Sequence, residues 1–473
     1  MLFPTVEYLL FFLAVLVIAW ALHRYSAWHK GFLLAASYAF YGFWNWNYVP
    51  LLAGISLFAG LTARRIQRAQ TQRGRKAWLV AGATVCLAVL AYYKYTTFFL
   101  TNLLAAWSHF APPPALAINS PVLPLGVSFF VFHAISLLGD CYRGKVKEPV
   151  RLADALLYVA FFPQLIAGPI LRASRFLPQL AKPRNPRALR VNRAFLLILG
   201  GLFKKVVLSN MLATRLVEPV FAVPQSYGSW DTLLAIYGYA AQIYCDFSGY
   251  TDIAIGCALL LGYRFPRNFN APYTAANPQE FWRRWHISLS SWLRDYLYFA
   301  LGGSRRGTLR TCLNLMLTML LGGLWHGAAW TFVAWGGLHG ALLVIHRFWS
   351  RIGWKPLVRM RGSITWLWIS RLLLFHAVCA GWVFFRASSF ANAFAVFARL
   401  AAPAAATLAT GPVLIVLILG LGGQYAPPRW RNAFELELGR WPVLLRGAAF
   451  AAVLAAIEVL GPSGVAPFIY FQF

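Results

Sequence analysis

The sequence predicts an all-α polytopic membrane protein, and three observations support this fold class. Of its 473 residues, 60% are hydrophobic and only 12% are charged, which is about half the charged fraction of a typical soluble domain. The apolar residues gather in runs of the length that crosses a bilayer as a helix, roughly 20 residues. Lys and Arg gather in short clusters between these runs, as they do in the cytoplasmic loops of membrane proteins.

Counting the apolar runs predicts about eleven transmembrane helices, with interfacial or re-entrant helices among the shorter runs. The runs are Tyr8–Leu22, Gly31–Leu61, Ala77–Tyr93, Leu123–Leu138, Ala153–Leu171, Ala194–Ala213, Thr232–Leu261, Cys312–Ile345, Ile364–Phe385, Leu414–Gly423 with its flanks, and Pro442–Leu460. No polar linker or low-complexity tract interrupts them, so we expect a single integral membrane domain over residues 1–473.

The net charge of +30 would suggest nucleic-acid binding in a soluble protein, but no basic-aromatic recognition module separates from the apolar runs, so no nucleic acid is expected. Three basic clusters instead predict cytoplasmic loops. They are Arg64–Lys76, Arg172–Arg193 and Arg347–Arg361. The segment Ala105–Val122 has no Lys or Arg and is expected outside. The first apolar run lacks the basic start of a cleavable signal and is followed by His23, Arg24 and Lys30. Its basic end is therefore expected in the cytoplasm, and the N-terminus is predicted outside.

A polar, aromatic and basic stretch between residues 262 and 309 departs from this pattern. Within it, Trp282, Trp285 and Leu289 recur at helical spacing, while Arg283 and Arg294 fall on other faces. Such a distribution predicts an interfacial helix within residues 279–296. Whether this helix also lines a pocket remains open at this point.

One histidine is placed unusually. His326 follows Gly322, Gly323 and Trp325 deep within an apolar run and precedes Gly327. An ionisable group at membrane depth is costly and suggests function, and glycines allow a ligand or another backbone to approach closely. The alternative is that His326 only packs against a neighbouring helix. His133 and His339 are further intramembrane candidates without an evident partner.

Few carboxylates lie within the apolar runs. Asp246 and Asp252 flank Ser248 in one of them. A spacing of six does not place two carboxylates on one helical face, and the cysteines form no CxxC pair, so no metal site is expected. Two interpretations remain: ion pairs with arginines between Arg283 and Arg294, or the lining of a pocket.

Several catalytic signatures are missing from the sequence. It contains no GxSxG elbow, no phosphate-binding loop and no HExxH. A covalent serine mechanism therefore has no support. A histidine in water-poor surroundings that takes a proton from a hydroxyl group is the remaining chemistry.

A set of motifs in one order resembles the membrane-bound O-acyltransferase (MBOAT) superfamily, in its bacterial polysaccharide-acetylating branch. The motifs are Pro124–Phe130, Phe161–Pro169, Tyr244–Asp252, Asn268–Tyr273, Phe281–Tyr296 and Leu324–Gly327, within a core of roughly 121–345. The resemblance implies a helical fold with a central funnel or channel. It implies that His326 is the membrane-embedded catalytic histidine and that His286 is the second one. It further implies donor-binding or channel-lining roles for motif residues, namely Trp325, Asn268, Ser128, Gln164, Asp246, Ser248, Asp252, Trp282, Arg283, Trp285, Arg294, Asp295 and Tyr296.

The resemblance leads to a specific hypothesis about function. An acyl thioester such as acetyl-CoA, used as a substrate and not as a bound cofactor, would donate from the cytoplasmic side. An exopolysaccharide, alginate or cellulose, would receive the acetyl group through a periplasmic partner protein of a bacterial inner membrane. The cytoplasmic arginines would attract the anionic donor or contact membrane lipid. The alternatives are D-alanyl or other acyl transfer by the same fold, and a donor or polymer transporter without chemistry.

Overall fold

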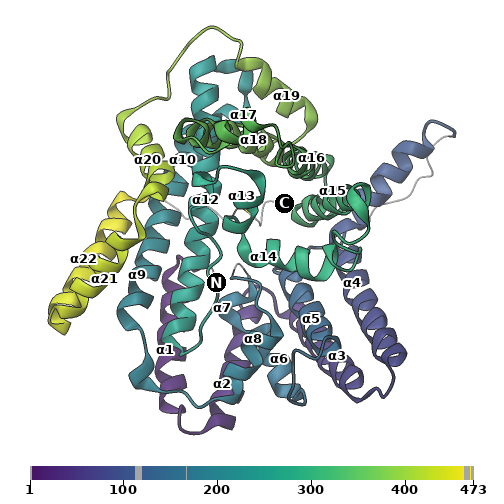
Figure 1. Cartoon of the computed structure of the whole chain (residues 1–473). Coiled ribbons are helices and arrows are strands. Elements are labelled where there is room, and N and C mark those ends of the chain that lie inside the picture. The colour runs from purple at the N-terminus through teal and green to yellow at the C-terminus, as the bar shows by residue number, and fades with distance from the viewer. Residues whose placement is uncertain (1–2, 112–119, 167, 463–468, 470–473) are drawn as a thin grey trace. The chain divides into compact units, whose positions relative to one another are not determined.

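The computed structural model describes residues 3–111, 120–166, 168–462 and 469 (Figure 1). These residues form helices, turns and loops, and none of them forms a strand. The chain divides into two compact units. The first comprises residues 1–190 and 257–266, and the second comprises residues 191–256 and 267–473. The expectation of one membrane domain stays a prediction.

The first unit is built from the N-terminal helices. In it, α3 packs against α4, α5 and α6, and α2 packs against α6. Its elements are α1 (Val6–Ala21), α2 (Ser26–Gly42), η1 (Trp46–Tyr48), α3 (Val49–Arg68), α4 (Gln72–Trp107), α5 (Val127–Tyr142), α6 (Leu152–Ala160), α7 (Phe162–Leu165), α8 (Ala173–Ala181) and η2 (Pro186–Ala188).

The second unit contains the candidate site, and several of its helices have π-helical turns. Its first elements are α9 (Val191–Leu202), η3 (Phe203–Ser209), α10 (Asn210–Leu212), η4 (Ala213–Val217), α11 (Glu218–Ala222), η5 (Pro224–Ser226), α12 (Ser229–Leu260, with its last turn in the first unit), η6 (Pro272–Thr274), α13 (Pro278–Arg284), α14 (Ile287–Trp292) and η7 (Leu293–Tyr298). Its later elements are α15 (Gly307–His326), α16 (Trp330–Trp349), α17 (Lys355–Arg361), α18 (Ile364–Arg386), α19 (Phe390–Arg399), α20 (Gly411–Gly422), η8 (Gly423–Tyr425), α21 (Pro428–Arg440) and α22 (Val443–Leu460).

Several helices are long and apolar enough to cross a membrane, so the all-α polytopic prediction is confirmed. Among the described residues, six helices meet both criteria, and a seventh span is possible if α20 with η8 is joined to α21 across a bend of 95°. The expected number of about eleven is higher, because runs such as Val6–Ala21 and Val127–Tyr142 form shorter apolar helices. The funnel implied by the family resemblance stays a prediction.

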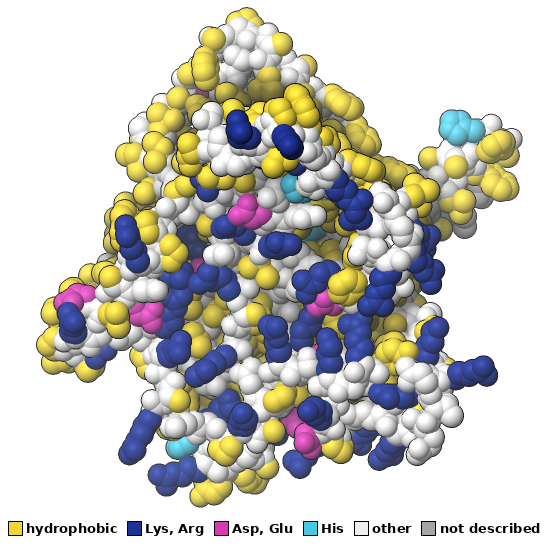
Figure 2. All heavy atoms as spheres, viewed as in Figure 1, with side chains coloured by type: hydrophobic (Ala, Val, Ile, Leu, Met, Phe, Trp, Pro, Cys, Tyr) yellow, Lys and Arg dark blue, Asp and Glu magenta, His cyan; other side chains and the backbone are white. Residues whose placement is uncertain are grey.

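The basic clusters occur largely at helix ends. The first cluster brackets the short connection between α3 and α4, and the third runs from the last turn of α16 through α17. Lys and Arg side chains far outnumber Asp and Glu on the face shown in Figure 2. Of the segment expected outside, α4 includes the beginning, and residues 112–119 lie outside the described residues.

Helices α15 and α16 pack against each other at very short range because glycines line their contact. A Cβ atom on Gly323 of α15 would lie 2.2 Å from the carbonyl oxygen of Phe332, and one on Gly336 of α16 would lie 2.3 Å from that of Met319. Small residues of this kind allow membrane helices to approach closely. The crossing places the last residue of α15, His326, beside the first turns of α16.

The prediction of one interfacial helix within residues 279–296 is wrong in its continuity. The structure divides this stretch into α13, α14 and η7. The break falls at His286, whose φ of 40° lies in the left-handed region. A residue with a side chain adopts this conformation only where surrounding contacts hold it, and such residues concentrate at functional sites.

Candidate functional site

His326 is the last residue of α15, and it is buried. Three aromatic rings surround its imidazole: Trp325 at 5.0 Å, Trp335 of α16 at 5.0 Å and Phe385 of α18 at 5.3 Å between ring centroids. All three are close to perpendicular to the imidazole, the edge-to-face arrangement that aromatic rings favour. The histidine therefore lies in apolar, ring-lined surroundings.

His286 is fully buried at the start of α14. Its Nδ1 lies 3.2 Å from the side-chain oxygen of Asn268, and that oxygen also accepts a hydrogen bond from the backbone N–H of Ser288 at 3.0 Å. Because an amide oxygen only accepts, this contact assigns the imidazole proton to Nδ1. The lone pair then lies on Nε2, which has no hydrogen-bond partner among the described residues.

The charge state of His286 follows from its burial. The residue lies outside the candidate membrane spans, and burial lowers the pKa of its imidazole from the usual value of 6.5 to about 3. The ring is therefore neutral at physiological pH, and Nε2 can accept a hydrogen bond from a substrate hydroxyl or a protonated group.

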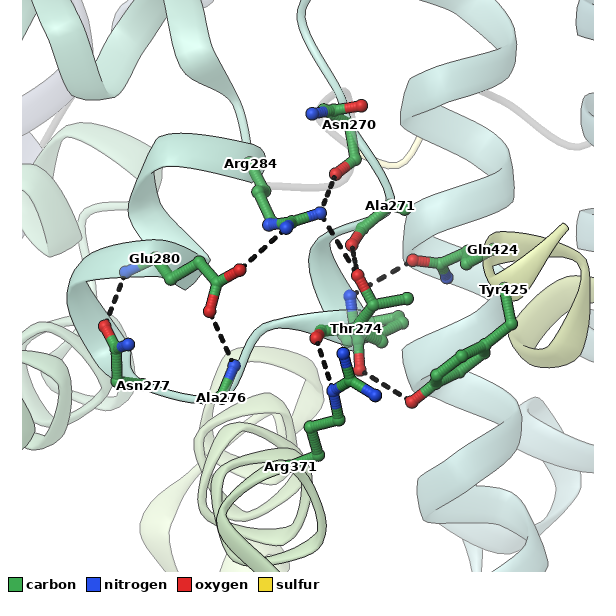
Figure 3. Close-up of polar contacts among 11 residues, drawn as sticks. Asn270, Ala271, Thr274, Ala276, Asn277, Glu280, Arg284, Arg371, Gln424 and Tyr425 are labelled. Carbon is green, nitrogen blue, oxygen red and sulfur yellow. Dashed lines mark hydrogen bonds and ion pairs between the residues drawn. The ribbon is translucent and has the colours of Figure 1, made fainter. Parts of the chain in front are cut away.

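The loop that carries Asn268 is tied together by an ion pair, drawn in Figure 3. Arg284 donates to the carboxylate of Glu280 at 2.7 Å and to the Thr274 hydroxyl at 3.2 Å. Glu280 in turn accepts from the backbone N–H of Ala276 at 2.9 Å. These contacts hold η6 against α13.

Neighbouring helices hold the same loop from outside (Figure 3). The guanidinium of Arg371 on α18 donates to the carbonyl of Thr274 at 3.0 Å. Gln424 accepts from the backbone N–H of Tyr273 at 3.1 Å, and the hydroxyl of Tyr425 donates to the carbonyl of Tyr273 at 3.3 Å. The backbone between Asn268 and His286 is therefore fixed by side chains from α18 and η8.

The two candidate catalytic histidines share one aromatic neighbour. Trp325 lies 6.3 Å from His286 and 5.0 Å from His326 between ring centroids. Beyond His326, Trp335 lies 4.8 Å from His339. The second unit thus contains a row of alternating imidazole and indole rings that begins at His286 and ends at His339.

Asp246 and Asp252 of α12 pair with lysines, so their predicted pairing with arginines 283–294 is wrong. Asp246 forms an ion pair with Lys205, and both side chains are buried. Asp252 pairs with Lys204, which also donates to Ser248 at 3.0 Å. Both lysines belong to the π-helical segment η3, whose wider turn is often associated with functional positions.

The remaining predicted residues of the second unit lie at different depths. Trp285 is buried against Phe281 and Trp382, and Trp282 is half-buried, 5.0 Å from His339. Arg283 and Arg294 are exposed, and Arg294 donates to Asp295 at 2.8 Å. Tyr296 contacts Trp292. The structure therefore brings the tryptophans, but not the two arginines, into the buried ring cluster.

Three candidates belong to the first unit. Ser128 is buried on α5, and Gln164 is buried on α7, where it donates to the carbonyl of Tyr158. His133 accepts at Nε2 from the backbone N–H of Leu171 at 3.2 Å, which gives this histidine a structural role. Ser128 and Gln164 as channel-lining residues stay a prediction.

Sequence reasoning missed Trp335, Phe385, Lys204 and Lys205. Two adjacent lysines inside the apolar run 194–213 are a signal that could have been used, because charges at membrane depth need partners. Trp335 and Phe385 carry no such signal, since aromatic residues are frequent throughout this chain. Among the described residues, no three His, Cys, Asp or Glu side chains are grouped as a metal site would require.

Comparison with known proteins identifies relatives over most of the chain. Residues 127–390 match the membrane-bound O-acyltransferase family. The chain is 36% identical to the probable alginate O-acetylase AlgI of Pseudomonas putida, over 93% of this chain and 94% of that protein. It is 39% identical to the peptidoglycan O-acetyltransferase of Helicobacter pylori, over 78% and 72% of the two chains. It is 29% identical to the teichoic acid D-alanyltransferase of Bacillus subtilis, over 66% and 79%.

The match covers both histidines, the loop that positions His286 and the two helices that enclose His326. The earlier resemblance is confirmed over more than half of the chain, and the chain belongs to the membrane-bound O-acyltransferase family and is an acyltransferase.

Proposed function

We propose that the protein O-acetylates an exopolysaccharide of the alginate type at a bacterial inner membrane. The acetyl group comes from a cytoplasmic thioester, acetyl-CoA or an equivalent, and reaches the polymer through a periplasmic partner protein. The supporting observation is the buried arrangement of His286 and His326 on either side of Trp325. The similarity to an alginate O-acetylase over nearly the whole chain supports the choice of acetyl group and polymer.

In this proposal His326 is the general base. It takes the proton of the acceptor hydroxyl while the hydroxyl oxygen attacks the thioester carbonyl carbon. The carbon–sulfur bond then breaks, and the proton passes from His326 to the departing thiolate, so that a free thiol and an ester are formed. His286, neutral and held by Asn268, accepts a hydrogen bond at Nε2 and positions donor or acceptor.

The experiment measures thiol release and ester formation with purified protein in lipid nanodiscs, acetyl-CoA and an alginate oligosaccharide, whose hydroxyl groups stand in for the acceptor hydroxyl of the partner protein. We expect His326→Ala to lower the rate by about 10²–10⁴-fold at unchanged thermal stability, and His286→Ala to lower it less. His376→Ala is the matched control, because that exposed histidine lies on α18 and pairs with Tyr237.

The same assay separates acyl transfer from transport, because a transporter would release no thiol even as the wild-type protein. A His326→Ala protein that turns over at the wild-type rate would show that His326 is structural, and the proposal would fail. Replacing acetyl-CoA by a D-alanyl thioester in the same assay tests the nature of the acyl group.

A further inference from the structure

His339 and Trp335 lie on one face of α16, beyond His326 in the row of rings. They are four residues apart, a spacing that places two side chains on the same side of a helix. Each is 1% exposed, and their ring centroids are 4.8 Å apart. Phe281 stacks on His339 at 5.8 Å, and Trp382 stacks on Trp335 at 5.9 Å. The pair is thus enclosed by aromatic rings.

Both side chains have a buried polar atom that the described residues leave without a hydrogen bond. These atoms are Nε2 of His339 and Nε1 of Trp335. Buried polar atoms in native proteins are nearly always hydrogen-bonded to protein groups or to ordered water. Two such atoms on neighbouring rings therefore indicate a ligand that is not part of the polypeptide.

The position of Gly381 on α18 shows where this ligand would lie. A Cβ atom on Gly381 would be 3.4 Å from His339 Nε2 and 3.3 Å from Cδ1 of Trp335. Cδ1 is bonded to Nε1 in the indole ring, so the Nε1 side of the indole and Nε2 of His339 both lie near this position beside Gly381. The glycine itself brings no side chain to that position, where Cδ2 of Leu338 would be the next nearest atom at 3.5 Å.

The chemistry of the two nitrogens selects the kind of ligand. An indole N–H only donates, whereas a neutral imidazole nitrogen accepts or donates according to its tautomer. A hydroxyl oxygen accepts from Trp335, and the same group can donate its proton to His339. A simple anion would bring an unpaired charge into these apolar, ring-lined surroundings, which is costly. An apolar group would leave both nitrogens unpaired.

We propose that a hydroxyl group, from a buried water molecule or from the acceptor, binds beside Gly381 between Trp335 Nε1 and His339 Nε2. Because the same indole lies 5.0 Å from the His326 ring, the bound hydroxyl holds Trp335 in place against His326. Trp335 and His339 are then positioning residues for transfer. This effect on transfer rests on the proposed function, whereas the site itself does not.

The test compares Gly381→Ala with Gly381→Ser in nanodiscs, with the acetyl-CoA assay and with thermal unfolding. Alanine places a methyl group where the hydroxyl binds and supplies no hydrogen bond. Serine places its own hydroxyl within reach of His339 Nε2. We expect Gly381→Ala to lower the rate constant by about tenfold to hundredfold, the effect of a small displacement near a reacting group, and Gly381→Ser to retain most of the activity and stability.

Steric crowding alone predicts the opposite order. Serine is larger than alanine and is the poorer helix former, so a Gly381→Ser protein equal to or worse than Gly381→Ala would overturn the proposal. A second pair of variants tests the site at His339, the other residue proposed to bind the hydroxyl. His339→Gln keeps a polar group near the position of Nε2 and should retain more activity than His339→Leu. Equal losses in these two variants would also contradict the site.

The kinetic constants distinguish the two sources of the hydroxyl. A buried water predicts that Gly381→Ala lowers kcat with an unchanged KM for the oligosaccharide, whereas an acceptor hydroxyl predicts a raised KM. The order of thermal stabilities, serine above alanine, tests the site without any assumption about catalysis. A failure of the proposed function would appear separately, as an active His326→Ala protein.

Discussion

At the scale of single residues, the orientation of His286 depends on Asn268. The side-chain oxygen of Asn268 contacts His286 Nδ1 and accepts from the Ser288 N–H, and its backbone carbonyl accepts from the Ile287 N–H at 2.8 Å. The backbone bond survives any substitution, while the two side-chain contacts do not. A single side chain therefore controls both the tautomer of His286 and the start of α14.

We expect Asn268→Ala to reduce acyl transfer strongly and to lower the free energy of unfolding by about 1–3 kcal/mol, because it leaves a buried donor without a partner. Thiol release and thermal unfolding measure the two effects. Asn270→Ala is the control, since that exposed side chain accepts a hydrogen bond from Arg267 at 2.8 Å and contacts neither His286 nor Ser288 among the described residues. Similar losses in both variants would argue against the positioning role.

At this scale the sequence led to candidate residues but not to the partners of the acidic ones. An intramembrane histidine among glycines and the family motifs were sufficient to select His326 and His286, whose catalytic roles stay a prediction. The partners of the acidic residues could not be predicted in the same way, because arginines 283–294 and lysines 204–205 are equally plausible on charge alone. Only the π-helical turn, which the sequence pattern does not reveal, aligns the two lysines with Asp246 and Asp252.

At the scale of elements, the close crossing of α15 and α16 positions His326 next to Trp335. Helical spacing and apolar runs predicted these helices, but the run Cys312–Ile345 was interpreted as one stretch. The structure ends α15 at His326 and begins α16 at Trp330. No proline or polar turn sequence marks this boundary; it is stabilised by the packing of Phe332 over Gly327, which leaves no room for a side chain there.

Two adjacent glycines on α16 test the importance of the crossing. Gly336→Ala would place a methyl group 2.3 Å from the Met319 carbonyl oxygen, so the helices must separate. We expect a loss of about 1–3 kcal/mol in stability together with reduced transfer. At Gly337 the nearest atom is a Leu320 methyl at 3.6 Å, so Gly337→Ala should be neutral or slightly stabilising. Thermal unfolding of both variants tests this difference, and equal melting temperatures would contradict the close crossing of α15 and α16.

The ion pairs between η3 and α12 provide a second test of element packing. Lys205 and Asp246 are 1% and 3% exposed, while Lys204 and Asp252 are 20% and 30% exposed. We expect Lys205→Met to cost about 3–5 kcal/mol, because it leaves a buried carboxylate uncompensated. Lys204→Met should cost less, since water reaches its partner.

The double variant Lys205→Met with Asp246→Asn removes both charges and should recover much of this stability. Asparagine also keeps an acceptor for the Ile469 backbone N–H, which lies 3.0 Å from Asp246. Thermal unfolding of the wild-type protein, Lys205→Met, Asp246→Asn and the double variant measures the coupling between the two side chains. A double variant no more stable than Lys205→Met alone would show that the pair contributes through packing and not through charge.

At the scale of the whole molecule, the prediction concerns orientation in the membrane. Helix α4 has 36 residues, and at 1.5 Å per residue it is about 54 Å long, well above the roughly 30 Å of a hydrocarbon core. Its two ends therefore lie on opposite sides. The basic cluster at its start predicts that this end is cytoplasmic, and the end near Trp107 is then outside.

Cysteine labelling in sealed cells tests this orientation at two exposed positions. We expect Arg68→Cys, at the end of α3, to resist a membrane-impermeant maleimide until the membrane is opened, and Ser108→Cys, just after α4, to react from outside. The six native cysteines interfere little, because five are buried and Cys312 is half-buried. Labelling of Arg68→Cys but not of Ser108→Cys would reverse the orientation. It would then place the basic loops, and any attraction they exert on an anionic donor, on the side opposite to the cytoplasm.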